Sequence, residues 1–246
     1  MPTQDPVHYI PIVTTVMALV FAVAVGRRWR ERRSGPHLLW WTAGILTYGA
    51  GTLTEALVTL LGWHAGLFKA WYITGALLGG APLAQGTVYL LFSRRTANRL
   101  TAVLLPLIIV ASAAAILSPI RVELIEQHRL SGAVLGWQWV RAFSPFINTY
   151  AFIFLAGGAA LSAWRYRRRR ETHHRFVGNT LIAIGALLPG IGGTATRFGH
   201  VEVLYVTEFI GLGLIWLGYR WNVKPTQAQP DTKQPDVAYG VAGQEV

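Results

Sequence analysis

Seven stretches of the chain are almost continuously apolar, and each is long enough for a membrane-spanning helix. About 20 apolar residues, each rising ~1.5 Å, cross the roughly 30 Å hydrocarbon layer of a bilayer. Basic residues gather between the stretches rather than within them. The predicted helices lie near His8–Gly26, Leu38–Leu61, Ala70–Phe92, Leu100–Leu117, Phe143–Trp164, Phe176–Ala195 and Val203–Tyr219. We therefore expect an all-α polytopic membrane protein, with a seven-helix transmembrane domain over residues 1–224.

The composition agrees with this pattern. Hydrophobic residues make up 52% of the 246 and charged residues only 13%, whereas a soluble domain carries about 25% charged residues. The chain has no Cys, which excludes disulfides, thiolate catalysis and cysteine-ligated metals.

The positive charges favour one orientation. Of the 22 Lys and Arg residues, sixteen fall on one side of the predicted helices, five on the other and Lys233 in the far tail. Cytoplasmic loops are enriched in Lys and Arg, so we expect the N-terminus outside and the C-terminus in the cytoplasm. Trp residues at the predicted helix ends agree with this topology. We attribute the net charge of +11 to topology, and we expect the lipid bilayer, not nucleic acid, as the partner.

Three further segments carry separate expectations. Residues 225–246 are polar and are predicted to be a disordered cytoplasmic tail; at this length they hold no output domain. The connection Ser118–Val140 is predicted to form a short amphipathic helix at the outer surface. Ala22-Val23-Ala24 resembles a signal-peptide cleavage site, but no positive residue precedes it and an Arg cluster follows. A retained helix is therefore favoured over a cleaved one.

Two acidic residues inside predicted helices are the main candidates for function, because ionisable groups in the membrane are costly and usually functional. Glu55 and Glu208 lie at similar depth, about 9 Å from the outer ends of their helices. Around them we place four further candidates near the same side, namely Asn148, Tyr72, Tyr150 and Arg197. We expect these six residues to face a ligand-binding cavity open to the outside. The alternative is structural: each Glu bonded to a neighbouring helix, and both Tyr residues anchored at the interface.

A second polar set lies toward the cytoplasmic side. It comprises Gln85, Tyr89, Asn179 and Thr180, and amides there glue helices together more often than they bind substrate. Gly and Pro residues mark two helices as closely packed or locally unwound: Gly75, Gly79, Gly80 and Pro82 in the third, and Pro189, Gly190, Gly192 and Gly193 in the sixth. Pro189 with its glycines is predicted to kink the sixth helix or, alternatively, to open it as in transporters.

Several chemistries lack the residues they need. The seven His residues lie at helix ends or in loops, so we expect no haem, no metal site and no other cofactor. No phosphate loop, dinucleotide fingerprint, nucleophile elbow or HExxH motif occurs. No Asp lies between Asp5 and Asp231, which speaks against an intramembrane lipid-modifying enzyme. We expect a protein that is not an enzyme.

Three stretches carry a resemblance: Leu67–Leu91, Ser144–Arg170 and Gly178–Gly199. In them the chain resembles a group of uncharacterised bacterial seven-helix membrane proteins. The pattern Trp41…Glu55…Trp71-Tyr72…Gly75 is loosely similar to the seven-helix sensor regions found ahead of bacterial histidine kinases. The resemblance implies the fold and the bacterial inner membrane, but no activity and no functional residues.

The resulting hypothesis is a membrane sensor or binding protein for a small or lipidic ligand in an outward-facing intramembrane cavity. No kinase or cyclase domain follows the seventh helix in this sequence, so we expect output through a protein partner. The alternatives are a proton-coupled transporter or carrier using the same carboxylates, and a structural subunit of a membrane complex.

Overall fold

The computed structural model describes residues 6–32, 35–126, 130–168 and 170–223. The predicted disordered tail 225–246 and the basic residues Arg33, Arg129 and Lys224 lie outside the described residues. Within them the chain is helical, and the β-type pairing is a bridge between Ile120 and Leu135.

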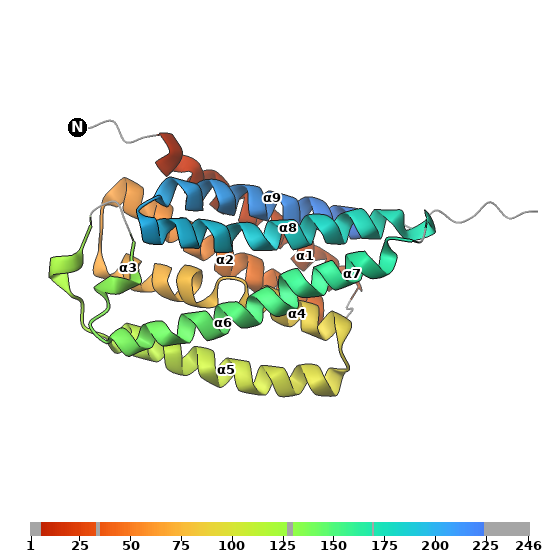
Figure 1. The fold of residues 1–246 in the computed structure, drawn as a ribbon, viewed down its shortest axis with the longest axis horizontal. Helices are drawn as coiled ribbons and strands as arrows, with labels where there is room; N and C mark the ends of the chain where they lie inside the picture. Colours follow the sequence, from red (N-terminus) through yellow and green to blue (C-terminus); the bar gives the residue numbers. More distant parts are fainter. Residues whose placement is uncertain (1–5, 33–34, 127–129, 169, 224–246) are drawn as a thin grey trace, which may run out of the picture.

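The helix axes lie roughly along the long axis of the molecule (Figure 1). In chain order they are α1 (Ile10–Arg32), α2 (Pro36–Leu61), α3 (Ala65–Trp71), the π-helix η2 (Tyr72–Leu78), α4 (Ala81–Leu91), α5 (Arg94–Leu117), α6 (Phe143–Ala151), the π-helix η6 (Phe152–Gly157), α7 (Gly158–Tyr166), α8 (His173–Ala195) and α9 (Val201–Val223). Short 3₁₀ turns precede α1, α6 and α8 and link α8 to α9.

Six segments in the described part are long and apolar enough to cross a membrane: Pro6–Arg32, Pro36–Leu61, Arg94–Leu117, Gln138–Tyr166, His173–Phe198 and Val201–Val223. This indicates a multi-pass membrane protein. The remaining predicted helix is present but interrupted, as α3, η2 and α4.

The interruption falls at Gly79 and Gly80. Gly79 has φ 35° and ψ −107°, a conformation that side chains with a Cβ rarely adopt. The predicted alternative of an opening at Pro189 is wrong, since α8 continues through that residue from His173 to Ala195. Pro189 packs close to Gly211 of α9, and one lost backbone hydrogen bond does not divide a helix held along its length by a neighbour.

Helices α8 and α9 form the closest pair (Figure 1). Gly178, Gly185 and Gly192 recur every seven residues along α8 and meet Gly218, Gly211 and Leu204 of α9, in antiparallel order. A Cβ added at Gly185 would lie 2.5 Å from the carbonyl oxygen of Gly211. Small residues let two backbones approach where the lipid offers no hydrophobic driving force, so this row of glycines fixes the register of α8 on α9.

The connection between α5 and α6 is not the amphipathic helix that the sequence predicts. Its described residues form three short 3₁₀ turns, Val122–Leu124, Gly132–Val134 and Gln138–Ala142. The backbone N–H of Arg121 donates to Val134 O at 2.8 Å. Val134, Leu135 and Val140 are fully buried against α3, η2 and α6. The turns bury these apolar side chains against the bundle, which a single amphipathic helix on the surface would not do. We attribute the difference from the prediction to this burial.

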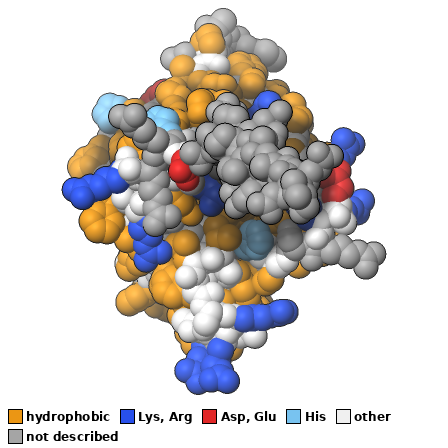
Figure 2. Space-filling model, turned by 90° about the vertical axis from the view of Figure 1, so that its right-hand side faces the viewer, with side chains coloured by type: hydrophobic (Ala, Val, Ile, Leu, Met, Phe, Trp, Pro, Cys, Tyr) orange, Lys and Arg blue, Asp and Glu red, His pale blue; other side chains and the backbone are white. Residues whose placement is uncertain are grey.

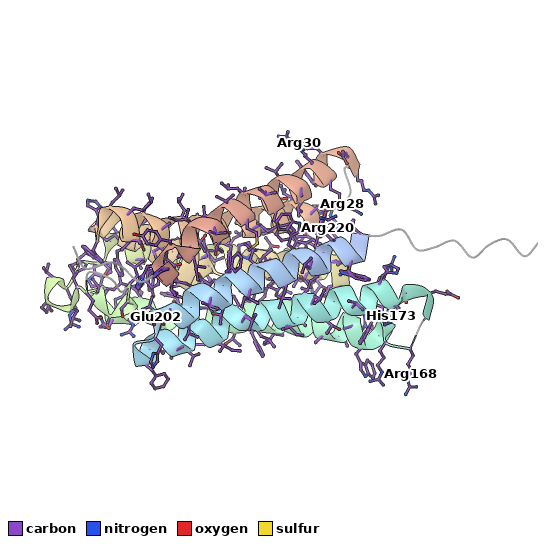
Figure 3. The ribbon with its side chains drawn as sticks, turned by 90° about the horizontal axis from the view of Figure 1, so that it is seen from above. Arg28, Arg30, Arg168, His173, Glu202 and Arg220 are labelled. Carbon is purple, nitrogen blue, oxygen red and sulfur yellow. The ribbon has the colours of Figure 1, made fainter. Side chains whose placement is uncertain are left out.

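The basic residues gather at one end of the bundle. In Figure 3, Arg28, Arg30, Arg168, His173 and Arg220 lie at the end where α1, α7 and α9 terminate, and Glu202 lies at the other end. Figure 2 looks onto the basic end, where Lys and Arg side chains stand around the rim. We call it the arginine-rich end; the opposite end carries the connection from Ser118 to Ala142.

The glycine row gives a direct test. We expect Gly185→Val to lower the free energy of unfolding by about 1–3 kcal/mol, the usual cost of overpacking, because its side chain would meet Gly211 O and Ile215. Gly190→Val on the same helix is the matched control, since nothing lies within 4 Å of a Cβ there. Thermal unfolding in detergent compares the two, and equal melting temperatures would contradict the packing argument.

Candidate functional site

The two glutamates predicted from the sequence lie together inside the bundle. Glu55 is on α2, six residues before its end at Leu61, and Glu208 is on α9, seven residues after its start at Val201. Both are therefore about 10 Å from the end of the bundle opposite the arginine-rich end. Glu55 is only 3% exposed, and the described part of the chain contains no cation paired with either carboxyl group.

Trp71, at the end of α3, holds one side of Glu55. Its indole Nε1–H donates to Glu55 Oε1 at 2.9 Å. The contact depends on two glycines, because a Cβ at Gly51 of α2 would lie 3.1 Å from the Cα of Gly75 in η2. That close approach brings the first half of the interrupted helix against the face of α2 that carries Glu55.

One oxygen of each carboxyl group is buried and lacks a hydrogen-bond partner among the described residues. Glu55 Oε2 and Glu208 Oε2 are buried and make no hydrogen bond to any other described group, while the two side chains lie within hydrogen-bonding reach of one another. A carboxylate oxygen only accepts hydrogen bonds. The pair is therefore satisfied when one proton, or another small cation, lies between its members.

Hydroxyl groups surround the pair. Tyr48 Oη–H donates to the backbone oxygen of Glu208 at 3.0 Å, which ties α2 to α9 next to the pair. Thr15 of α1 and Thr52 of α2 share a hydrogen bond of 2.9 Å between their hydroxyls. Tyr205 lies one helical turn before Glu208, is 5% exposed, and meets the ring of His8 edge-on at 5.8 Å.

The other four predicted site residues lie elsewhere. The Tyr72 hydroxyl lies 3.5 Å from Val140 O in the connection and 3.3 Å from Ser144 Oγ of α6, and its ring packs near those of Phe68 and Trp71. Asn148 donates to the carbonyl oxygen of Ala76 at 3.0 Å. Arg197 is exposed in the turn between α8 and α9. Tyr150 belongs to the second polar set. The structure therefore brings together two of the six residues.

The second polar set is divided in the same way. Tyr150 Oη–H donates to Gln85 Oε1, and Gln85 Nε2–H donates to Thr101 Oγ1 at 2.8 Å and to the backbone of α5. Tyr89 joins this network through Thr101 and Asn98.

Thr180 donates to Phe176 O of its own helix. Asn179 lies apart and bonds to Asn222 of α9 at 3.1 Å. Gln85 is fully buried with each of its amide groups bonded, as expected of a group that joins helices.

Neither a metal-binding cluster nor the surface ion pair contributes to the site around Glu55 and Glu208 in the described residues. The described residues contain no group of three or more His, Asp or Glu residues that could hold a metal ion. Outside the membrane segments, a hydrogen bond to its own backbone and another from Arg121 hold the pKa of Glu123 below its usual range. This pair lies in the connection after α5 and does not reach the buried carboxyl groups.

Three residues of the site were not among the sequence candidates. Trp71 looks like an interface anchor by position, yet it points inward onto Glu55; its place in the pattern Trp41…Glu55…Trp71 was the available signal. Tyr48 lies seven residues before Glu55, and Tyr205 three before Glu208. These spacings put each Tyr on the same helix face as a Glu, which was a usable signal.

Comparisons of the chain with protein-family models, with curated proteins and with solved structures found no match. The geometry of the site is therefore the basis for assigning a function.

The Trp71–Glu55 hydrogen bond can be measured. We expect Trp71→Phe to lower the free energy of unfolding by about 1–3 kcal/mol, the cost of leaving a buried acceptor unsatisfied. Trp63→Phe is the control, because the buried Nε1 of Trp63 has no hydrogen-bond partner among the described residues and both rings contact Phe68. If the two variants melt at the same temperature in detergent, the bond contributes nothing.

Proposed function

We propose that this is a membrane binding protein that takes a small cation, in the simplest case a proton, between Glu55 and Glu208. One observation carries the proposal: neighbouring carboxyl groups on α2 and α9 each have a buried oxygen that lacks a partner among the described residues. A structural role would pair each with a donor, as Trp71 does for the other oxygen of Glu55.

The chemistry of the pair favours a cation over an anion or a bulky lipid. Both groups supply acceptor oxygens, and the predicted cationic partner Arg197 lies outside the site. Ionisable side chains inside membrane segments commonly serve proton relays or ion paths. Loss of the bound cation leaves two adjacent negative charges in a medium of low dielectric, which favours separation of α2 from α9.

That separation would act on the first half of the interrupted helix. Trp71 binds Glu55 from α3, and α3 joins η2 before the break at Gly79 and Gly80. We propose that occupancy of the carboxyl pair is passed to this half-helix, and from there to a partner protein. The pattern Trp41…Glu55…Trp71 that resembles sensor regions fits this assignment, since Glu55 and Trp71 contact each other directly.

A proton-coupled carrier is the second candidate, and the interrupted helix is the observation that favours it. Discontinuous helices commonly frame the binding sites of transporters. In either case we propose that the arginine-rich end faces the cytoplasm of a bacterial cell, with the N-terminus outside, and that the protein is not an enzyme.

The test compares Glu55→Gln and Glu208→Gln with Glu202→Gln, an exposed acidic residue of α9. We expect the wild type to lose thermal stability as the pH rises, because removal of the shared proton leaves two adjacent carboxylates. Glu208→Gln should be much less sensitive, since its amide donates to Glu55 at any pH, and Glu202→Gln should behave as the wild type. The infrared carbonyl band of a protonated carboxyl group should be lost with rising pH, and it should be absent from both site variants.

Two results would contradict the proposal. One is an identical pH dependence of melting in the wild type and Glu208→Gln; the other is a carboxyl band that persists in both site variants. Sodium and ammonium ions then test other cations: either one should restore wild-type stability at high pH if it can replace the proton. In proteoliposomes, an imposed pH gradient distinguishes the two candidates, since a carrier moves protons and a sensor does not.

A further inference from the structure

A second candidate site lies at the arginine-rich end, where α7 finishes. Trp164, Arg165, Tyr166, Arg167 and Arg168 line an open cavity of about 680 Å³. Three of the five are arginines, and all three are exposed.

The cavity has fixed aromatic walls beside its charges. The guanidinium of Arg167 lies 4.9 Å from the ring centroid of Trp164. Arg175, from the first turn of α8, lies 5.6 Å from the ring of Tyr166 and donates to its hydroxyl at 3.4 Å. Stacking against an aromatic face leaves the N–H groups at the guanidinium edge free to donate.

None of these arginines forms an ion pair with another described residue. The ion pair found among the described residues joins Arg121 to Glu123, at the opposite end of the bundle. A concentration of unpaired guanidinium groups around a hollow favours an anionic ligand, and the forked donors of arginine match the oxygens of a phosphate group.

The position of the cavity indicates where such a phosphate comes from. Trp164 is 58% exposed at the point where an apolar helix gives way to basic residues, which is typical of the headgroup level of a bilayer. Its ring offers an apolar surface on the membrane side, and the arginines follow on the water side. Juxtamembrane basic clusters attract anionic lipids of the cytoplasmic leaflet.

We propose that this cavity binds the phosphate headgroup of an anionic phospholipid, with Arg165, Arg167 and Arg168 as donors and Trp164 against the lipid chain. The site is separate from the Glu55–Glu208 pair, and it does not depend on the function proposed for that pair. Charge alone would give a diffuse attraction around the whole rim, whereas a built site depends on these residues in particular.

The experiment uses the full chain, exchanged into detergent with equal amounts of phosphatidylglycerol and phosphatidylcholine and then measured by native mass spectrometry. We expect the wild type to retain phosphatidylglycerol preferentially. Replacing Arg165, Arg167 and Arg168 together by Gln should reduce that retention several-fold. The matched control is the same replacement of Arg94, Arg95 and Arg99 at the start of α5, which removes equal charge from the same end and should retain the lipid. Trp164→Leu, a single change on the lipid-facing wall, should also weaken retention and serves if the triple variant does not fold.

Three outcomes would overturn the proposal. Equal loss in the two triple variants would show a diffuse basic rim. Equal retention of the two lipids would show no preference for an anionic headgroup. Displacement of phosphatidylglycerol by soluble inorganic phosphate at the same concentration would show a site for a free anion instead of a lipid.

Discussion

A polar group inside the hydrocarbon layer has no water to bond with, and this constraint explains the arrangement of the bundle's interior. Buried hydroxyls and amides find partners on their own or a neighbouring helix: Thr15 with Thr52, Gln85 with Tyr150 and Thr101, and Asn179 with Asn222. Even the interrupted helix follows the rule, since Asn148 donates to the carbonyl of Ala76 just before the break. Against that background, four buried side-chain atoms of the described residues lack a partner: Trp63 Nε1, His174 Nε2, and one carboxyl oxygen each of Glu55 and Glu208.

The sequence predicts the fold well and the site only in part. Runs of about 20 apolar residues identify spanning helices because the thickness of the bilayer sets one length for all of them. They do not reveal where such a helix breaks. The Gly- and Pro-rich segments at Gly79-Gly80 and at Pro189 are similar in sequence. Tertiary contacts determine that only the first interrupts its helix. Pro189 is held against Gly211 of α9, whereas Gly79 adopts a positive φ beside Asn148.

The sequence indicates how deep each polar residue lies in the membrane. It does not indicate which face of the helix carries that residue. Glu55, Glu208, Tyr72 and Tyr150 all follow from the sequence as polar groups inside helices, yet only the two glutamates meet. Tyr72 and Trp71 are neighbours in the chain, and a helix turns by about 100° per residue, so they face different surroundings. Tyr72 packs against the connection after α5 and Trp71 against Glu55. Membrane helices are apolar on every side, so their periodicity does not identify the inward face.

The interrupted helix links the two polar clusters of the bundle. Its first half carries Trp71, which binds the carboxyl pair, and its second half carries Gln85, which is bonded to α5 and α6. Gly79 and Gly80 separate the halves, so rotation of α3 and η2 need not be transmitted rigidly to α4. Under the proposed function, a cation that enters or leaves between Glu55 and Glu208 would first displace α3 and the connection that packs on it. Both lie at the end of the bundle opposite the arginines. Under the proposed function, α2 and α9 would carry the change to the arginine-rich end, because both helices extend to that end and each bears one member of the pair.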